Sequence, residues 1–400
     1  MEILSCENVA FKYNESTDYA ISDCTFSVKK GEKIMLCGAS GSGKSTLLRL
    51  LKRELSPRGE LSGNITLMGK DRSELSDRES AEKIGFVMQS PDSQTVCDKV
   101  SAELAFGLES FGVKSGEIQS RVGEMAAFFG IEPLYDRDIS TLSGGQKQLV
   151  ALCSVMVTDP DILLLDEPTA QLDPVAAREL LGILDRLNKE MGVTIIIAEH
   201  DPEELFDSCD KILYLAKGKT VFFGTPALTA KYFVENALEG FLPETSKAFA
   251  GLCDDLPLNV RQGRAKLEKL GVMDIPKQVV NAADSAEPYA LQCKNLWQRY
   301  EKSSPDILKG CDLGIRKGEC YGLLGSNGGG KSTLLRVICG LCKPYMGAVS
   351  LFGKKQKAYK NGSLFHEMLA FLPQEPVTMF VKESVREDLL QSGDKAAVEN

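Results

Sequence analysis

Two segments of this chain combine glycine, lysine and serine at a spacing that suits phosphate binding. Each reads G-x-x-x-x-G-K-S and is followed by Thr-Leu-Leu-Arg. Glycines let the backbone curl so that successive N–H groups face phosphate oxygens, while the lysine reaches the outer phosphates and the serine hydroxyl ligates Mg²⁺. The two matches predict that the chain binds a nucleoside triphosphate and has two places for it. The residues are Gly38, Ala39, Ser40, Gly41, Ser42, Gly43, Lys44, Ser45 and Thr46 in the first segment, and Gly325, Ser326, Asn327, Gly328, Gly329, Gly330, Lys331, Ser332 and Thr333 in the second.

Each of these loops lies between an apolar segment of strand length and a run of helix-forming residues. The first loop is flanked by 34–37 and 46–51, and the second by 321–324 and 333–338. In such a strand–loop–helix unit the helix N-terminus faces the phosphate, and its dipole favours the negative charge. The pattern predicts an α/β fold with both loops at strand ends.

Another pattern with chemical potential is an apolar segment, 162–165, that ends in Asp166 and Glu167. Neighbouring side chains of a strand point to opposite faces, so we expect the two acids to have different roles. Asp166 is placed to hold Mg²⁺ through water, and Glu167 to activate the attacking water as general base. The alternative is a strand followed by a solvated acidic turn. The phosphate loop upstream favours the catalytic interpretation.

A serine and two glycines precede the helical run 147–157. Ser143, Gly144, Gly145 and Gln146 offer a hydroxyl, close backbone approach and the positive end of a helix dipole, which together suit a phosphate. The same residues also fit a simple helix N-cap. Both interpretations remain open from the sequence.

Two further polar residues follow apolar segments. His200 comes after 194–198, and Gln89 comes after 84–88. Ligands of α/β proteins bind at the carboxyl ends of strands. We therefore expect the neutral imidazole of His200 to hydrogen-bond the outer phosphate, although a lone histidine is more often structural. The amide oxygen of Gln89 is placed to reach Mg²⁺ or the attacking water.

The order of features repeats along the chain. Tyr13 and Tyr300 stand at the same distance before their loops, which start at residues 38 and 325. An aromatic ring there could stack on a nucleobase or pack in the core, and the repeated spacing favours stacking. Further on, 372–374 resembles 87–89, so that Gln374 corresponds to Gln89, and 385–389 resembles 100–104. A shared order of features predicts a duplicated domain.

Three parts follow from this repeat. We expect a complete first domain over 1–225, a helical extension and linker over 226–288, and the N-terminal part of a second domain over 289–400. The features that the first copy carries between about 120 and 225 have no counterpart in the second copy. We therefore expect the chain to be a fragment of a longer protein.

Composition narrows the classes of function. A formal charge of −9 and a pI near 5.1 argue against nucleic acid as the main partner, which requires a basic face. The apolar runs are of strand length, so any membrane role must come through a partner. The 12 cysteines are scattered singly apart from Cys339 and Cys342, which predicts reduced thiols in a cytosolic protein rather than a zinc or disulfide site.

Taken in order, these motifs resemble those of an ATP-binding cassette (ABC) ATPase. The resemblance spans 1–225 and the start of a second cassette. It implies a RecA-like P-loop NTPase core with an antiparallel β subdomain and a helical subdomain, duplicated, which binds ATP and Mg²⁺. In that family cassettes dimerise head to tail, so that 143–146 of one copy contact the ATP held by the phosphate loop of the other. The matching motifs are Tyr13, the first phosphate loop, Gln89, 142–146, Asp166 with Glu167, 170–173 and His200.

A finer resemblance points to the energy-coupling-factor group of cobalt and vitamin importers. It is carried by 88–94, 103–109 and 142–148. It implies an ATPase subunit at the cytoplasmic face of the membrane that powers uptake of a vitamin, vitamin precursor or metal ion, bound to a transmembrane scaffold and substrate-capture proteins. The chain departs from the family at Leu149, where arginine is usual, and at Gln171, where glycine or alanine is common.

Two alternatives from other classes remain. One is a soluble tandem ABC ATPase that acts on ribosomes, a group that usually joins its cassettes by a long, highly charged helix. Here 226–288 is of mixed character with 7 basic residues, and the acidic pI agrees with the importer. The other is a catalytically silent fragment that only binds ATP. An ATP-binding and hydrolysing importer subunit is the leading hypothesis.

Overall fold

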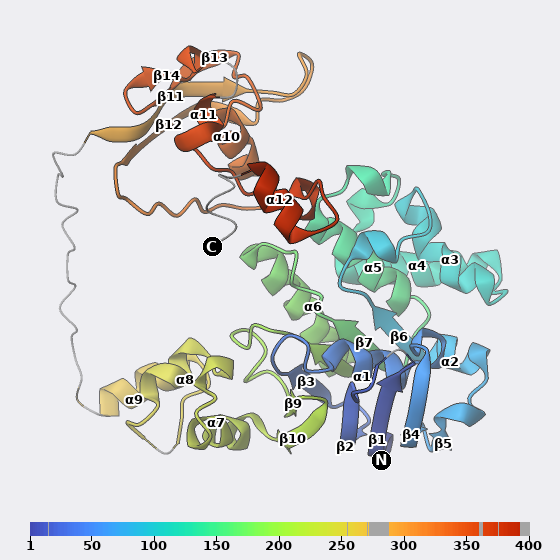
Figure 1. Cartoon of the computed structure of the whole chain (residues 1–400). Helices are drawn as coiled ribbons and strands as arrows, with labels where there is room; N and C mark the ends of the chain where they lie inside the picture. The colour runs from blue at the N-terminus through green and yellow to red at the C-terminus, as the bar shows by residue number, and fades with distance from the viewer. Residues whose placement is uncertain are drawn as a thin grey trace. The chain divides into compact units, whose positions relative to one another are not determined.

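The computed structural model describes residues 1–14, 16–253, 255–269, 271, 288–359, 363–374 and 376–392. The chain divides into two compact units, Met1–Gln278 and Val279–Asn400, whose elements are labelled in Figure 1. Among the described residues no helix is long and apolar enough to cross a bilayer.

The first unit is built around a six-stranded sheet in the order β10-β9-β3-β8-β7-β6. All neighbours pair in parallel except β10, which is antiparallel to β9. Every residue of β3, β6, β7 and β8 is buried, as expected of parallel strands covered on both faces. The bounds are β3 Lys33–Cys37, β6 Ile84–Val87, β7 Ile162–Asp166, β8 Thr194–Ala198, β9 Lys211–Ala216 and β10 Lys219–Gly224.

Alternation along these strands divides the core of the first unit into two clusters. Leu163 and Leu165 of β7 belong to one cluster with the helices α3–α6, whereas Ile162 and Leu164 belong to the other with α1 and the antiparallel sheet. Successive side chains of a strand face opposite sides, so the parallel sheet is covered on both faces. The helices are α1 Lys44–Leu51, α3 Val100–Ser110, α4 Ser115–Phe129, α5 Gly144–Met156 and α6 Pro174–Met191.

A second, antiparallel sheet in the order β2-β1-β4-β5 completes this fold, and it lies beside α1 in Figure 1. Its strands are β1 Glu2–Tyr13, β2 Ile21–Lys29, β4 Gly59–Leu67 and β5 Lys70–Asp71. Short helices connect the larger elements: η1 Arg53–Leu55, η2 Arg72–Glu74, α2 Asp77–Lys83, η3 Pro91–Ser93, η4 Glu132–Leu134 and η5 Ile139–Thr141. The RecA-like core, the antiparallel β subdomain and the helical subdomain implied by the resemblance are thus confirmed.

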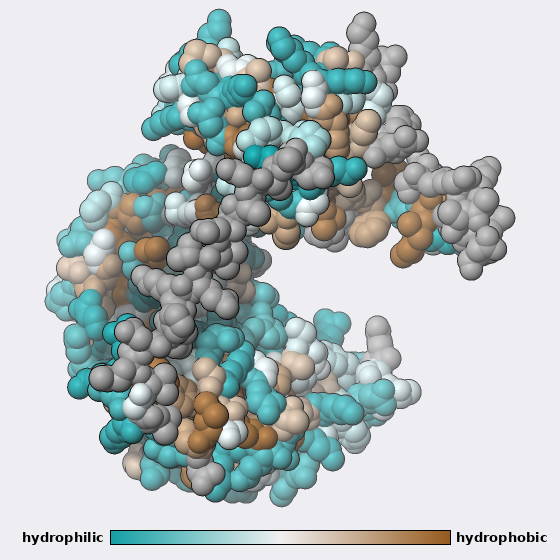
Figure 2. Space-filling model, turned by 90° about the vertical axis from the view of Figure 1, so that its left-hand side faces the viewer, coloured by the Kyte–Doolittle hydropathy of each residue, from teal (hydrophilic) through white to brown (hydrophobic). Residues whose placement is uncertain are grey.

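Helices that follow β10 complete the first unit. They are α7 Pro226–Glu235, η6 Glu239–Phe241, α8 Glu244–Phe249 and α9 Val260–Lys269. Phe233 and Phe249 join the core cluster that contains Tyr214 of β9. Leu228, Leu252 and Val260 are exposed, and Figure 2 shows brown apolar residues among teal ones over this part of the surface. The rest of the expected linker, 272–287, lies outside the described residues.

The second unit contains an antiparallel sheet in the order β12-β11-β13-β14 with the helix α10 packed against it. This strand order is the same as that of β2-β1-β4-β5 in the first unit. The bounds are β11 Tyr289–Gln298, β12 Leu308–Arg316, β13 Met346–Leu351 and β14 Lys354–Lys355, with helices α10 Lys331–Ile338, η7 Gln356–Ala358, α11 Ser363–Glu367, η8 Pro376–Met379 and α12 Val385–Ser392.

One predicted strand of the second unit is wrong. Residues 321–324 form no strand, and Leu324 is 92% exposed. In the first unit β3 is hydrogen-bonded to β8 and β9, whereas the described part of the second unit has no strand beside 321–324. A strand needs neighbours for its N–H and C=O groups, so apolar residues alone do not form one here.

Candidate ATP-binding and hydrolysis site

The first phosphate loop connects the buried end of β3 to the N-terminus of α1. Gly43 directly precedes the helix with φ of +103°, a left-handed conformation that favours glycine. A Cβ atom at Gly43 would lie 2.8 Å from the carbonyl oxygen of Ala20. The backbone can therefore take this path only with glycine at that position. This explains in physical terms why the second glycine of the G-x-x-x-x-G-K-S pattern is needed here.

Lys44 is held inside the loop. Its side chain is buried, and its Nζ donates to the carbonyl oxygens of Gly38 at 2.9 Å and Ala39 at 3.2 Å. Burial lowers the pKa of Lys44, and the nearby carboxylate of Glu167 opposes this shift. The loop thus places one buried cation where the outer phosphates of a nucleotide would lie.

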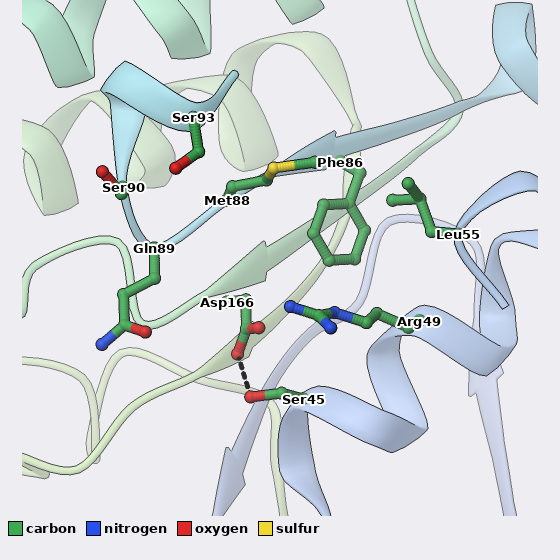
Figure 3. Close-up of a pocket in the computed structure, with 9 residues that line it drawn as sticks. All are labelled: Ser45, Arg49, Leu55, Phe86, Met88, Gln89, Ser90, Ser93 and Asp166. Atoms are coloured by element: carbon green, nitrogen blue, oxygen red, sulfur yellow. Dashed lines mark hydrogen bonds between the residues drawn. The ribbon is translucent and has the colours of Figure 1, made fainter. Parts of the chain in front are cut away.

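A hydroxyl and a carboxylate meet beside the loop (Figure 3). Ser45 Oγ donates to Asp166 Oδ1 at 2.7 Å, and both residues line a cavity of about 440 Å³ together with Gln89. Burial raises the pKa of Asp166, while the Ser45 hydroxyl opposes the shift. Hydroxyl, carboxylate and amide oxygens are ligands that suit Mg²⁺, so the donor set fits the metal that the sequence predicts here.

Glu167 is held between two polar side chains. Its Oε1 lies 2.7 Å from His200 Nε2, and its Oε2 accepts from Gln89 Nε2 at 3.0 Å. Glu167 directly follows β7, His200 comes two residues after the end of β8, and Gln89 comes two residues after the end of β6. These three strands are adjacent in the sheet. The structure therefore brings together all three residues that the sequence predicts to act in hydrolysis.

Tyr13 lies against the same loop. Its Oη is 2.9 Å from Thr46 Oγ1, and its side chain is 37% exposed. A cavity of about 370 Å³ is lined by Tyr13, the loop residues, Glu167 and His200. The ring is at the edge of this cavity rather than inside the core, as stacking on a base requires.

Residues 143–146 lie apart from that cavity. Ser143 caps α5: its Oγ accepts from Gln146 N at 3.3 Å, and Gln146 Oε1 accepts from Ser143 N at 3.0 Å. The N-cap alternative is thus realised as a capping box. Ser143 and Gly144 are exposed. Neither these two residues nor Gly145 and Gln146 line the cavity of the first loop, so their contact with a phosphate stays a prediction.

The second loop repeats the contacts of the first. Lys331 Nζ donates to the carbonyl oxygens of Gly325 at 2.6 Å and Ser326 at 2.8 Å. Tyr300 Oη lies 3.2 Å from Thr333 Oγ1. Gln374 is exposed and follows no strand in the described part of the second unit, so the structure does not bring it to the second loop.

The sequence motifs do not include two residues near the first site, Arg49 and Glu199. Arg49 lines the cavity with Ser45 and Asp166, and its position one helical turn after Ser45 was a signal that could have identified it. Glu199 is 4% exposed and directly precedes His200. An acid at the end of an apolar strand was the corresponding signal in the sequence.

Comparison with known proteins identifies the family. The sequence pattern of the family described as ABC transporter matches residues 21–170 and 308–400. A putative ABC transporter ATP-binding protein of Bacillus thuringiensis is 37% identical over 386 residues, which are 96% of this chain and 70% of the relative. A putative HMP/thiamine import ATP-binding protein of Bacillus subtilis is 32% identical over 411 residues, covering 100% of this chain and 72% of the relative.

Solved structures agree with this assignment. The structure of cbiO1 from Clostridium perfringens, described as part of the ABC transporter complex cbiONQ, matches with a TM-score of 0.53 and 34% identity, over 60% of this chain and 94% of that chain. A phosphate-binding loop, an acid pair at a strand end and a helical subdomain with one helix that begins at Ser-Gly-Gly are all present in the first unit. The chain belongs to the ABC transporter family and is an ATP-binding protein of the ABC ATPase class.

Proposed function

We propose that this chain is the ATP-hydrolysing subunit of an importer of the energy-coupling-factor type, with the first unit providing a hydrolysis site. The observation that carries the enzymatic part is the contact of Glu167 with both Gln89 and His200. These contacts hold a carboxylate at the edge of the cavity that also contains the phosphate loop. A general base needs this proximity to the site of attack.

Each residue of the site has a distinct role in this proposal. Lys44 would neutralise the outer phosphates. The Ser45 hydroxyl would ligate Mg²⁺ and the Asp166 carboxylate would hold it through water, and the ion would neutralise phosphate charge. Glu167 takes the proton of the attacking water. His200 holds the outer phosphate and orients Glu167 through the 2.7 Å contact. Gln89, which follows β6, donates to Glu167 and also lines the cavity of about 440 Å³.

The importer part rests on sequence likeness. The Bacillus subtilis relative is described as a putative HMP/thiamine import ATP-binding protein, and the Clostridium perfringens structure as part of the complex cbiONQ. Together with the motifs at 88–94, 103–109 and 142–148, this likeness supports uptake of a vitamin, vitamin precursor or metal ion. In this proposal the chain binds a transmembrane scaffold and substrate-capture proteins at the cytoplasmic face of the membrane, and 143–146 contact ATP across a head-to-tail pair of cassettes.

Co-purification tests the importer against the ribosomal alternative. We expect the affinity-tagged chain, extracted from native cells with mild detergent, to carry integral membrane proteins that mass spectrometry identifies. The net charge of −9 gives no general attraction to ribosomal RNA. Sedimentation of the tagged chain with ribosomes, without membrane proteins, would contradict the importer and leave the ATPase assignment unchanged.

The position of Tyr13 at the edge of the cavity leads to a prediction about nucleotide affinity. We expect Tyr13→Ala to weaken ATP binding by about 1–3 kcal/mol, the usual contribution of stacking a base on an aromatic ring, which is about 5- to 150-fold in Kd. Tyr13→Phe removes only the hydroxyl that contacts Thr46 and should bind ATP much better than Tyr13→Ala. Calorimetric titration in a Lys331→Ala background reads the first site alone. Equal Kd values for Tyr13→Ala and the parent would contradict stacking.

A further inference from the structure

We infer that Glu199 is a positioning residue that fastens the loop carrying Glu167 to the loop carrying His200. The inference rests on the proposed function of Glu167 as general base. It assigns no contact with ATP to Glu199. Its role is to keep the side chains of Glu167 and His200 in fixed positions relative to each other while the bound nucleotide and the partner proteins change.

Glu199 is a buried acid with dedicated hydrogen-bond donors. It is 4% exposed, and its Oε1 accepts from the backbone N of Thr169 at 3.0 Å and from Thr169 Oγ1 at 2.7 Å. The backbone N–H of His200 also donates to the carboxylate. Burying a carboxylate is unfavourable unless it is hydrogen-bonded. These donors therefore make the position of Glu199 specific.

Thr169 belongs to the turn that follows the catalytic acid. The N–H of Ala170 donates to the carbonyl of Glu167 at 3.2 Å, and the N–H of Leu172 donates to the carbonyl of Thr169 at 2.9 Å. Holding Thr169 thus holds the turn that starts at Glu167. The same turn leads to the N-terminus of α6 at Asp173, which caps the helix.

The backbone of Glu167 needs this support. It has φ of +48°, a left-handed conformation that is strained in a residue with a Cβ atom and persists only where the surroundings impose it. Its N–H donates to the carbonyl of Ala198 at 2.9 Å, and the N–H of Glu199 donates to the carbonyl of Leu36 at 3.3 Å. Glu199 is thus anchored to β3, the strand that leads into the phosphate loop, and in turn anchors the turn after Glu167.

The contact between the two catalytic side chains depends on the relative position of these loops. Glu167 Oε1 lies 2.7 Å from His200 Nε2. Glu167 precedes Thr169 in one loop and His200 directly follows Glu199 in the other, so the hydrogen bonds between Thr169 and Glu199 join the two loops. Burial raises the pKa of Glu199, and the hydrogen bonds of Thr169 and His200 oppose that shift. The acid and its donors therefore favour one arrangement of the two loops over others.

The test separates turnover from binding. We expect Glu199→Leu, which keeps the volume but removes the acceptor, to lower kcat for ATP hydrolysis by about 10- to 100-fold, because a small misplacement of reacting groups has effects of that size. ATP affinity, measured by calorimetry, should change little because Lys44 and the loop remain in place. Glu199→Gln keeps an oxygen at the Oε1 position and should lose much less activity than Glu199→Leu.

Substitutions at the partner residue make the test independent of the folding of the Glu199 variants. Thr169→Val removes the hydroxyl donor and should lower kcat, whereas Thr169→Ser keeps the hydroxyl and should restore most of it. The combination of Thr169→Val with Glu199→Leu should be less harmful than the product of the two single effects. Glu204→Gln is the matched control, since this nearby acid pairs only with exposed Arg178 in the described contacts.

The outcomes distinguish this inference from the proposed function. If Glu167→Gln abolishes hydrolysis while Glu199→Leu and Thr169→Val leave kcat at the level of Glu204→Gln, the positioning role is overturned and the general base stands. If Glu199→Leu lowers ATP affinity as much as kcat, its role is structural only, and the inference is also overturned. A normal rate in Glu167→Gln would instead overturn the proposed function.

Discussion

Glu167→Gln should lower ATP hydrolysis by about 10²–10⁴-fold, the usual contribution of a positioned general base, while ATP binding stays intact. The amide is nearly the same size as the carboxylate but does not take up the proton of the attacking water. In the structure the carboxylate oxygens of Glu167 contact His200 and Gln89. The substituted amide keeps one oxygen for such contacts, so the loss should be in the chemical step and not in the shape of the site.

The measurement is steady-state turnover of the full chain over a range of protein concentrations, beside ATP affinity by calorimetry. Glu204→Gln serves as the control because it neutralises an acid of the same region that is 44% exposed. Turnover of Glu167→Gln close to that of Glu204→Gln would show that another group activates the water.

Lys44→Ala should weaken nucleotide binding itself. We expect the Kd for ATP at the first loop to rise about 10- to 100-fold, because hydrogen bonds to charged groups contribute about 1.5–3 kcal/mol each. Lys44 is 4% exposed and sits over the carbonyls of Gly38 and Ala39. Water would not replace its charge fully in that position. Hydrolysis should fall with binding, in contrast to Glu167→Gln.

Two additional variants make this result specific to the first loop. Lys331→Ala in the same chain removes the corresponding lysine of the second loop, so that the remaining titration reports Lys44. Lys30→Ala is the matched control, because Lys30 is 57% exposed and pairs with Asp161, a contact that contributes little at a surface. Equal ATP affinities for Lys44→Ala and Lys30→Ala in the Lys331→Ala background would contradict the role of Lys44.

Local patterns in the sequence identified the ABC ATPase fold and most of its first site. The phosphate loop needs glycine at residue 43 because of its backbone conformation and close packing. A short segment of sequence is therefore enough to predict phosphate binding by this loop. Likewise 162–165 and 194–198 predict buried strands because a parallel sheet covered on both faces requires continuous apolar residues. Asp166, Glu167 and His200 follow those strands directly, so their meeting at one sheet edge was predictable.

Contacts between distant segments were decided only by the tertiary structure. The sequence alone could not show that Glu167 lies between Gln89 and His200, or that Glu199 accepts from Thr169, because these pairs are set by strand order. No single segment of the sequence determines the order of strands in the sheet. The failed strand at 321–324 has the same cause, since its apolar residues match β3 but the described part of its unit offers no strands for its N–H and C=O groups. Local sequence determines which residues suit a strand, a loop or an acid pair, and long-range hydrogen bonding and packing determine whether those elements form and which side chains meet.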